Sequence, residues 1–140
     1  MSADAVLDVS GLTTRFNTPD GVVHAVNGVS FELRAGEFLG VVGESGSGKS
    51  VTMMSLLKLI PMPPGRIDGG VADFGGDDLL SIGASELRSV RGGQIGFIFQ
   101  DPMTSLNPVL TIGKQLAEPV MLHAGVDRKA AKARAIELLD

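Results

Sequence analysis

The stretch FLGVVGESGSGKSVTMMSLLKLI, residues 38–60, constrains the fold of this chain more than any other segment. An apolar run leads into the pattern G-x-x-x-x-G-K-[ST] at Gly43, Gly48, Lys49 and Ser50, and apolar residues at helical spacing follow. A chain of this composition contains the pattern by chance about once in a hundred sequences. Chance does not also supply the flanking elements, so the segment predicts a phosphate-binding loop between a buried strand and a helix.

Each residue type in this loop has its own physical role. Glycine reaches backbone conformations that are closed to other residues, and it keeps side chains away from a ligand. The N–H groups of residues 45–50 can converge on phosphate oxygens at the helix N-terminus, where the helix dipole favours negative charge. Lys49 would bridge the β- and γ-phosphates, and the Ser50 hydroxyl would be a Mg²⁺ ligand. The loop residues expected to bind a nucleotide are Gly43, Ser45, Gly46, Ser47, Gly48, Lys49, Ser50 and Val51.

Length and composition exclude several other classes of function. The chain has 140 residues, of which 44% are hydrophobic and 20% charged, as in one globular domain. Its net charge of −4 provides no basic surface for a nucleic-acid backbone. It contains no cysteine, which removes disulfides and thiolate sites and fits the cytosol. No apolar run approaches the ~18 residues of a membrane span, so a membrane role would come through a partner.

Glycine and proline divide the chain into short elements. The first part predicts an antiparallel meander, with a strand over 5–16, a turn over 17–21 and a return over 22–33. Residues 37–43 predict a strand buried on both faces. Residues 50–59 predict a helix whose apolar face consists of Met53, Met54, Leu56, Leu57 and Ile60.

The second part of the chain follows a cluster of prolines. Its pattern predicts a hairpin over 66–80, a short helix over 84–91 with Ser85 as N-cap, and a buried strand over 93–100. Two helices are expected over 111–125 and 127–140, the second N-capped by Asp127.

The segments that flank the loop resemble one family. VVGESGSGKSVT, followed about fifty residues later by IGFIFQDPMTSLNP, residues 95–108, resembles the ATP-binding subunit of ABC transporters, and the second phrase resembles the Q-loop of that family. The segments GGDDLL and ELRSVRGGQ lie between these two motifs. With them, the sequence is most similar to the oligopeptide/dipeptide importer branch over essentially the whole chain.

The resemblance implies an α/β P-loop NTPase fold with a mixed sheet, present as an incomplete, N-terminal part of the domain. The implied parts are the β-meander and P-loop unit (1–60), the hairpin, short helix and strand to the Q-loop (61–100), and the Q-loop with the start of a helical subdomain (101–140). Residues 1–140 would then be a partial nucleotide-binding domain, with ATP and Mg²⁺ as its cofactors.

The resemblance also assigns roles outside the loop. Phe16 stands where family members stack adenine, usually on Tyr; the alternative is a core aromatic of a strand. Gln100 matches the Q-loop glutamine, which reaches Mg²⁺ or the attacking water and so joins Lys49 as a catalytic residue; otherwise it is a polar residue at a strand end. The segment Asp101–Pro108 would contact the membrane permease, with Met103 and Leu106 packing on a partner helix, or be an ordinary surface loop. A second ATP-binding subunit would complete a dimer.

Departures from the family pattern limit the expected activity. Hydrolysis needs a strand of four apolar residues ending in Asp-Glu, and neither this Walker B pattern nor the LSGGQ signature occurs in the sequence. VRGGQ at 90–94 lacks the serine and precedes the Q-loop, and His24 and His123 do not stand where the switch histidine would, so each is expected at the surface or its boundary. The chain is therefore expected to bind Mg-ATP weakly, to hydrolyse none alone, and to be marginally stable.

Location and alternatives follow from the same resemblance. The intact subunit would lie in the cytoplasm, peripheral on the inner face of the plasma membrane, and would couple ATP hydrolysis to import of a substrate that this sequence does not specify. Another P-loop NTPase, a kinase or GTPase, is one alternative, although the guanine-reading N-K-x-D motif does not occur. A non-catalytic fragment that docks on a permease is the other.

Overall fold

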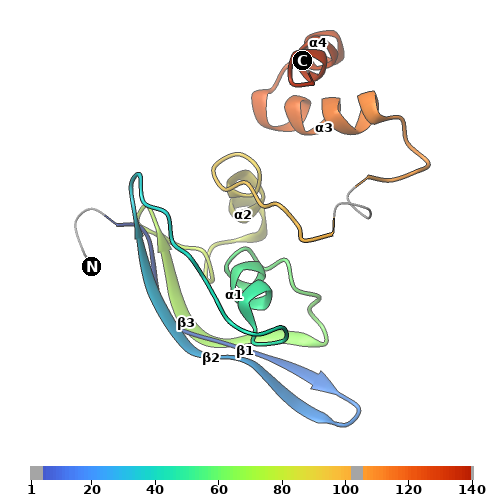
Figure 1. Cartoon of the computed structure of the whole chain (residues 1–140). Helices are drawn as coiled ribbons and strands as arrows, with labels where there is room; N and C mark the ends of the chain where they lie inside the picture. Colours follow the sequence, from blue (N-terminus) through green and yellow to red (C-terminus); the bar gives the residue numbers. More distant parts are fainter. Residues whose placement is uncertain (1–4, 102–105, 140) are drawn as a thin grey trace. The chain divides into compact units, whose positions relative to one another are not determined.

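The computed structural model describes residues 5–101 and 106–139, and the chain forms two compact units, Met1–Gly83 and Ala84–Asp140. The first unit contains β1 (Ala5–Thr18), β2 (Gly21–Arg34), α1 (Lys49–Leu56), β3 (Gly65–Phe74) and β4 (Asp77–Asp78). The second contains α2 (Ala84–Val90), α3 (Ile112–Ala124) and α4 (Arg128–Glu137), as labelled in Figure 1. Among the described residues, none of the helices has the length and apolarity needed to cross a membrane.

The described strands form one antiparallel sheet in the order β2-β1-β3-β4. β1 and β2 meet at a turn over Pro19 and Asp20, with Thr18 opposite Gly21, which confirms the predicted meander. β3 and β4 confirm the predicted hairpin: Gly75 and Gly76 join them with φ of 64° and 97°, the positive values that a two-residue type I′ turn requires.

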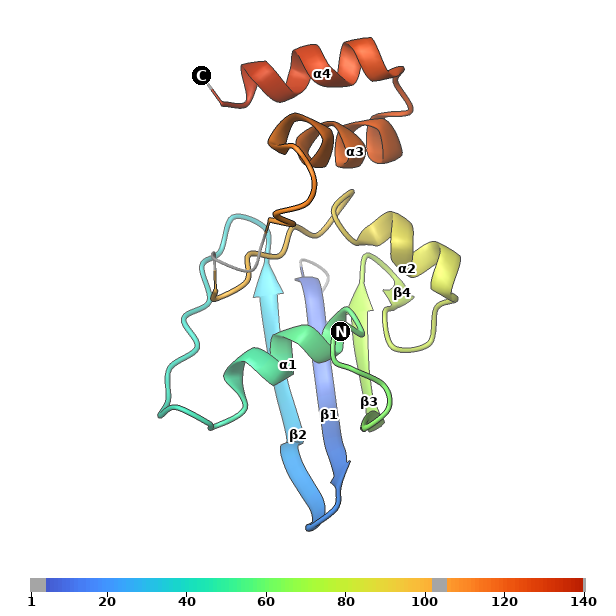
Figure 2. The ribbon, with the colours of Figure 1, turned by 90° about the vertical axis from the view of Figure 1, so that its right-hand side faces the viewer.

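Helix α1 crosses one face of this sheet, over β2 and β1 (Figure 2). Beneath it lies the core of the first unit, which contains Val9, Leu12, Leu56, Leu57, Ile60, Ala72 and Leu79. The predicted apolar face of α1 was partly wrong: Thr52 and Ser55 are buried, whereas Met53 and Met54 are only half-buried. Both buried hydroxyls have partners: Ser55 meets Thr14 of β1 across the helix–sheet contact, and Thr52 bonds the Gly48 carbonyl within the helix.

The two predicted buried strands are not strands in this structure. Residues 37–43 have no regular structure, with Phe38 101% and Val42 93% exposed. Residues 93–100 form only one isolated bridge, between Arg91 and Ile95, and Ile98 is 97% exposed. A strand exists only where a neighbouring strand receives its backbone hydrogen bonds. The apolar pattern was recognised in both segments, but the described residues provide no adjacent strand for either.

The second unit is built from helices. The helix predicted over 84–91 forms as α2, but it begins at Ala84, so Ser85 lies inside it and is not its N-cap. The two C-terminal helices were predicted, and the Asp127 side chain caps α4 by accepting a hydrogen bond of 2.8 Å from the Ala130 N–H. Small buried residues between α3 and α4 allow the two helices to approach closely; they are Ala117, Ala131 and Ala135.

Candidate functional site

The loop over residues 43–48 leads directly into α1. Gly46 and Gly48 adopt left-handed φ values of 80° and 92°, which favour glycine. Gly48 is the N-cap residue of α1, and among the described residues no side chain caps the helix. Because the first four N–H groups of a helix have no intrahelical partner, those of the first turn remain available to an anion at this end.

Gly48 also fixes where the loop lies. A Cβ atom built on Gly48 would collide with the backbone carbonyl oxygen of Ala25 on β2. Only a residue without a side chain can approach the strand this closely. The loop and the start of α1 therefore rest directly on the backbone of β2.

Lys49 turns its side chain back into the loop. Its Nζ donates hydrogen bonds to the carbonyl oxygens of Gly43, at 2.8 Å, and Glu44, at 2.6 Å, and to Ser47 Oγ at 3.3 Å. These contacts hold the ammonium group of the half-buried Lys49 at the centre of the loop. Gly43 supports the arrangement, because a Cβ atom there would lie 2.9 Å from Ser47 Oγ.

The first turn of α1 carries the remaining loop residues. Ser50 is exposed, as a metal-ligand role requires, and Val51 is half-buried. Thr52 Oγ1 donates a hydrogen bond of 2.9 Å to the Gly48 carbonyl, which joins the loop to the helix body. Gly43 through Val51 therefore lie together in the loop and the first turn of α1, and nucleotide binding by these residues stays a prediction.

Phe16 lies on the α1 side of the sheet. It is half-buried and pairs with Val23 of β2 and Gly65 of β3. A Cβ atom on Gly65 would lie 2.9 Å from Phe16 Cε1, so the ring covers this glycine. Phe16 is thus neither a fully buried core residue nor an isolated surface residue, and it shares a sheet face with the loop over residues 43–48.

Gln100 and the segment after it belong to the second unit. Gln100 is exposed at a bend, and its approach to the loop of the first unit stays a prediction. Met103 lies outside the described residues, and Leu106 is 48% exposed. The end of the segment is held to α3 by Gln115, whose side chain accepts a hydrogen bond of 2.8 Å from the Asn107 N–H and donates to the carbonyls of Asn107 and Leu110, each at 2.9 Å.

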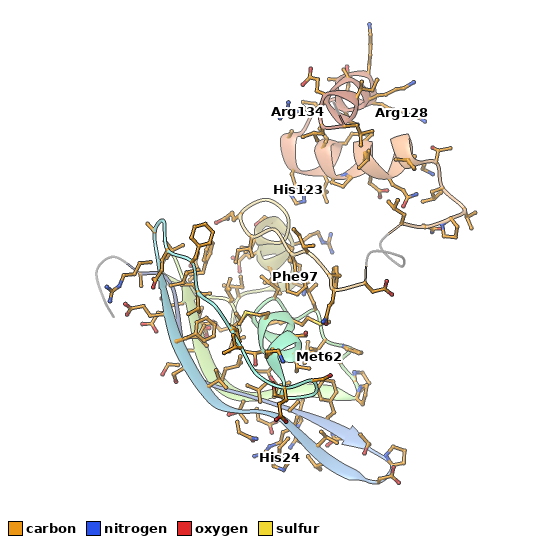
Figure 3. The ribbon with its side chains drawn as sticks, viewed as in Figure 1. His24, Met62, Phe97, His123, Arg128 and Arg134 are labelled. Atoms are coloured by element: carbon orange, nitrogen blue, oxygen red, sulfur yellow. The ribbon has the colours of Figure 1, made fainter. Side chains whose placement is uncertain are left out.

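Supporting residues of the site were not identified from the sequence. Ala25 carries no chemical signal, because its role lies in its backbone carbonyl. Thr14 and Ser55 are polar residues at positions where the strand and helix periodicities call for apolar ones, and this mismatch is a signal that could have found them. The two histidines are exposed, as expected; Figure 3 shows His24 on the sheet face opposite α1, and His123 on α3.

A family model described as "ABC transporter" matches residues 26–140, which is most of the chain. The chain belongs to the ABC transporter family. It is 51% identical over 135 residues to the oligopeptide transport ATP-binding protein OppD of Bacillus subtilis, covering 96% of this chain and 38% of that protein. The OppD of Escherichia coli is 51% identical over 138 residues, covering 99% of this chain and 40% of the relative. The chain thus spans about two fifths of the length of these curated relatives.

Solved structures show the same fold. The ABC transporter cassette MJ0796, in its dimeric structure and in a post-hydrolysis state bound to ADP and Pi, superposes with a TM-score of 0.77 and 23% sequence identity. The match covers 94% of this chain and 54% of the cassette. The fold class is therefore confirmed as an ATP-binding cassette, α/β with an antiparallel sheet and an incomplete domain.

Proposed function

We propose that this chain is the nucleotide-binding part of the ATP-binding subunit of a peptide-type ABC importer. The observation that carries the proposal is the geometry of residues 43–51, in which an uncapped helix N-terminus, left-handed glycines and an inward-turned lysine converge. Relatives named oligopeptide transport ATP-binding proteins support the substrate class.

The nucleotide phosphates would be held by the backbone N–H groups of residues 45–50 and by the Lys49 ammonium. Lys49 would exchange its hydrogen bonds to the Gly43 and Glu44 carbonyls for bonds to phosphate oxygens. The Ser50 hydroxyl would hold Mg²⁺, which when bound would neutralise charge on the β- and γ-phosphates. This oxygen donor fits a hard cation.

The base would stack on Phe16. Its half-buried ring has one side against Gly65, which restricts its motion and leaves part of its surface accessible. Phenylalanine provides the π-face of the usual tyrosine without its hydroxyl. Stacking of a base on an aromatic ring contributes about 1–3 kcal/mol.

For this chain alone we propose weak Mg-ATP binding without hydrolysis. The sequence contains no Walker B carboxylates, and among the described residues no three acidic, histidine or cysteine side chains are grouped as a metal site. The test is phosphate release from Mg-ATP by the purified chain, with Lys49→Ala as the matched control. We expect the two rates to equal the background, and turnover that Lys49→Ala abolishes would refute the proposal.

The proposed partners are membrane permease subunits, contacted through Asp101–Pro108, and a second ATP-binding subunit. With these partners the protein would lie in the cytoplasm, on the inner face of the plasma membrane. Exposure of Leu106 supports the first contact. Co-purification with the permease tests it. Leu106→Ser should reduce recovery, whereas Leu122→Ser, which changes an exposed leucine of α3, should not. Equal recovery of both variants would count against this docking segment.

Residues 37–43 and 93–100 leave apolar side chains in water, Phe38, Val42 and Ile98 among them. The chain alone should therefore bind a hydrophobic dye. Phe38→Ser should reduce the fluorescence relative to wild type, and an unchanged signal would contradict the assignment of the exposed surface.

A further inference from the structure

Two hydroxyl groups meet in the core of the first unit, where the proposed phosphate contacts do not use them. Thr14 Oγ1 of β1 donates a hydrogen bond of 2.9 Å to Ser55 Oγ of α1, and both residues are 0% exposed. Ser55 Oγ in turn donates to the Val51 carbonyl at 2.7 Å. Neither hydroxyl hydrogen is therefore left without an acceptor.

Packing alone does not require this pair. Replacing both partners of a buried hydrogen bond by apolar groups of the same shape is often nearly neutral for stability, and valine and alanine would fill these positions. A hydrogen bond differs from an apolar contact because it fixes distance and direction. The pair therefore sets how α1 lies along β1, which an apolar contact would leave less defined.

The position of the pair connects it to two parts of the proposed site. Thr14 precedes Phe16 by two residues on β1, and the two pair in unbroken register with Ile67 and Gly65 of β3, so they lie on the same face of β1. Ser55 belongs to the helix that begins at Lys49. The loop itself rests on β2 through Gly48, so the hydrogen bond is a separate link, between the helix of the phosphate site and the strand of the ring.

We propose that Thr14 and Ser55 are positioning residues that set the separation between the Phe16 ring and the phosphate loop. The site then fits a ligand in which a planar base and a polyphosphate are joined by a sugar, and it distinguishes a nucleoside triphosphate from a bare polyphosphate. The inference rests on the proposed nucleotide-binding function. Misalignment would weaken the base contact and leave the phosphate contacts in place.

Calorimetric titration of the full chain with two ligands, Mg-ATP and Mg-tripolyphosphate, tests this. For Thr14→Val and Ser55→Ala we expect Mg-ATP affinity to fall about 3- to 10-fold, part of the total that base stacking can contribute. Tripolyphosphate affinity should stay within about 2-fold of wild type, which also shows that the variants are folded. Thr14→Ser, which keeps the hydroxyl, should restore the Mg-ATP affinity.

Thr13→Val is the matched control, because Thr13 is the preceding residue and its hydroxyl bonds Gly11 and Gly28 rather than α1. It should leave the ratio of the two affinities unchanged. Equal losses for both ligands in Thr14→Val, or no loss for either, would overturn the inference and reduce the pair to a stabilising contact.

Phe16→Ala separates this inference from the function on which it rests. If Phe16→Ala weakens Mg-ATP binding while Thr14→Val leaves the ratio unchanged, only the positioning role fails. If Phe16→Ala changes nothing, the base site on Phe16 is wrong, and the inference falls with it.

Discussion

Replacing Gly48 by alanine should destabilise the chain more than any other Gly→Ala change in the loop. Gly48 has φ of 92°, and an alanine in a left-handed conformation costs about 1–2 kcal/mol. The new Cβ would also overlap the Ala25 carbonyl, a backbone atom that cannot rotate away, and overpacking of this kind costs about 1–3 kcal/mol. The sum, about 2–5 kcal/mol, is a large part of a typical domain stability of about 5–15 kcal/mol.

Urea unfolding followed by far-UV circular dichroism measures this, because the chain has no tryptophan or tyrosine for fluorescence. Two further glycines separate the cost of the left-handed conformation from the cost of the overlap with Ala25. Gly46→Ala carries only the backbone cost, since Gly46 has φ of 80° and nothing within 4 Å of its Cβ position. Gly40→Ala carries neither cost and should be neutral or slightly stabilising. Equal unfolding midpoints for Gly48→Ala and Gly46→Ala would refute the close approach of the loop to β2.

Three further changes test the first unit. Lys58 has φ of 48° and ends α1 in a Schellman motif, in which the Lys58 N–H bonds the Ser55 carbonyl and the Leu59 N–H bonds the Met54 carbonyl. The free energy of unfolding in urea should be about 1 kcal/mol higher for Lys58→Gly than for Lys58→Ala, because glycine adopts this conformation without strain. The reverse order would contradict the strain at Lys58. Asp8 of β1 stands opposite Glu32 of β2 and Asp73 of β3, so three like charges lie side by side. Asp8→Asn should raise the free energy of unfolding by about 0.5 kcal/mol at low salt and by less at high salt. A lower free energy of unfolding would show that no repulsion exists there. Burial would raise the pKa of Asp78, but hydrogen bonds from the Ala72 and Leu80 amides and from Ser81, with the charge of Lys58, lower it below 3.8. The stabilisation from Asp78 is thus present above pH 3.8 and is lost as the pH falls through the folded-state pKa. Asp78→Asn should therefore flatten the decline of the urea midpoint between pH 5 and 2. An unchanged pH profile would contradict the lowered pKa.

The parts of the fold that sequence predicted are those specified by local signals. The turn at Pro19 and Asp20, the glycines joining β3 to β4, and the Asp127 cap each determine the conformation of neighbouring residues only. The glycine-rich turn into α1 was predicted for the same reason, since its glycines, lysine and serine lie within eight consecutive residues, and phosphate binding there stays a prediction.

The parts that failed depend on distant residues. The strands expected at 37–43 and 93–100 need neighbouring strands, which an apolar pattern does not supply. The buried face of α1 was misjudged because a hydroxyl on β1, 41 residues away in the chain, makes Ser55 an inner-face residue. The contact of Phe16 with Gly65 is likewise non-local. The role of Gln100 remains a prediction, because it belongs to the other unit.

We propose that residues 43–51 hold the phosphates of a nucleotide, with Lys49 at the centre of the loop. Calorimetric titration of Mg-ATP into wild-type chain and into Lys49→Met tests it most directly, with circular dichroism confirming that both are equally folded. We expect measurable binding to wild type and a loss of at least about 10-fold in Lys49→Met, since a charge-assisted hydrogen bond to phosphate contributes about 1.5–3 kcal/mol. Equal affinity of the two folded proteins for Mg-ATP would contradict it.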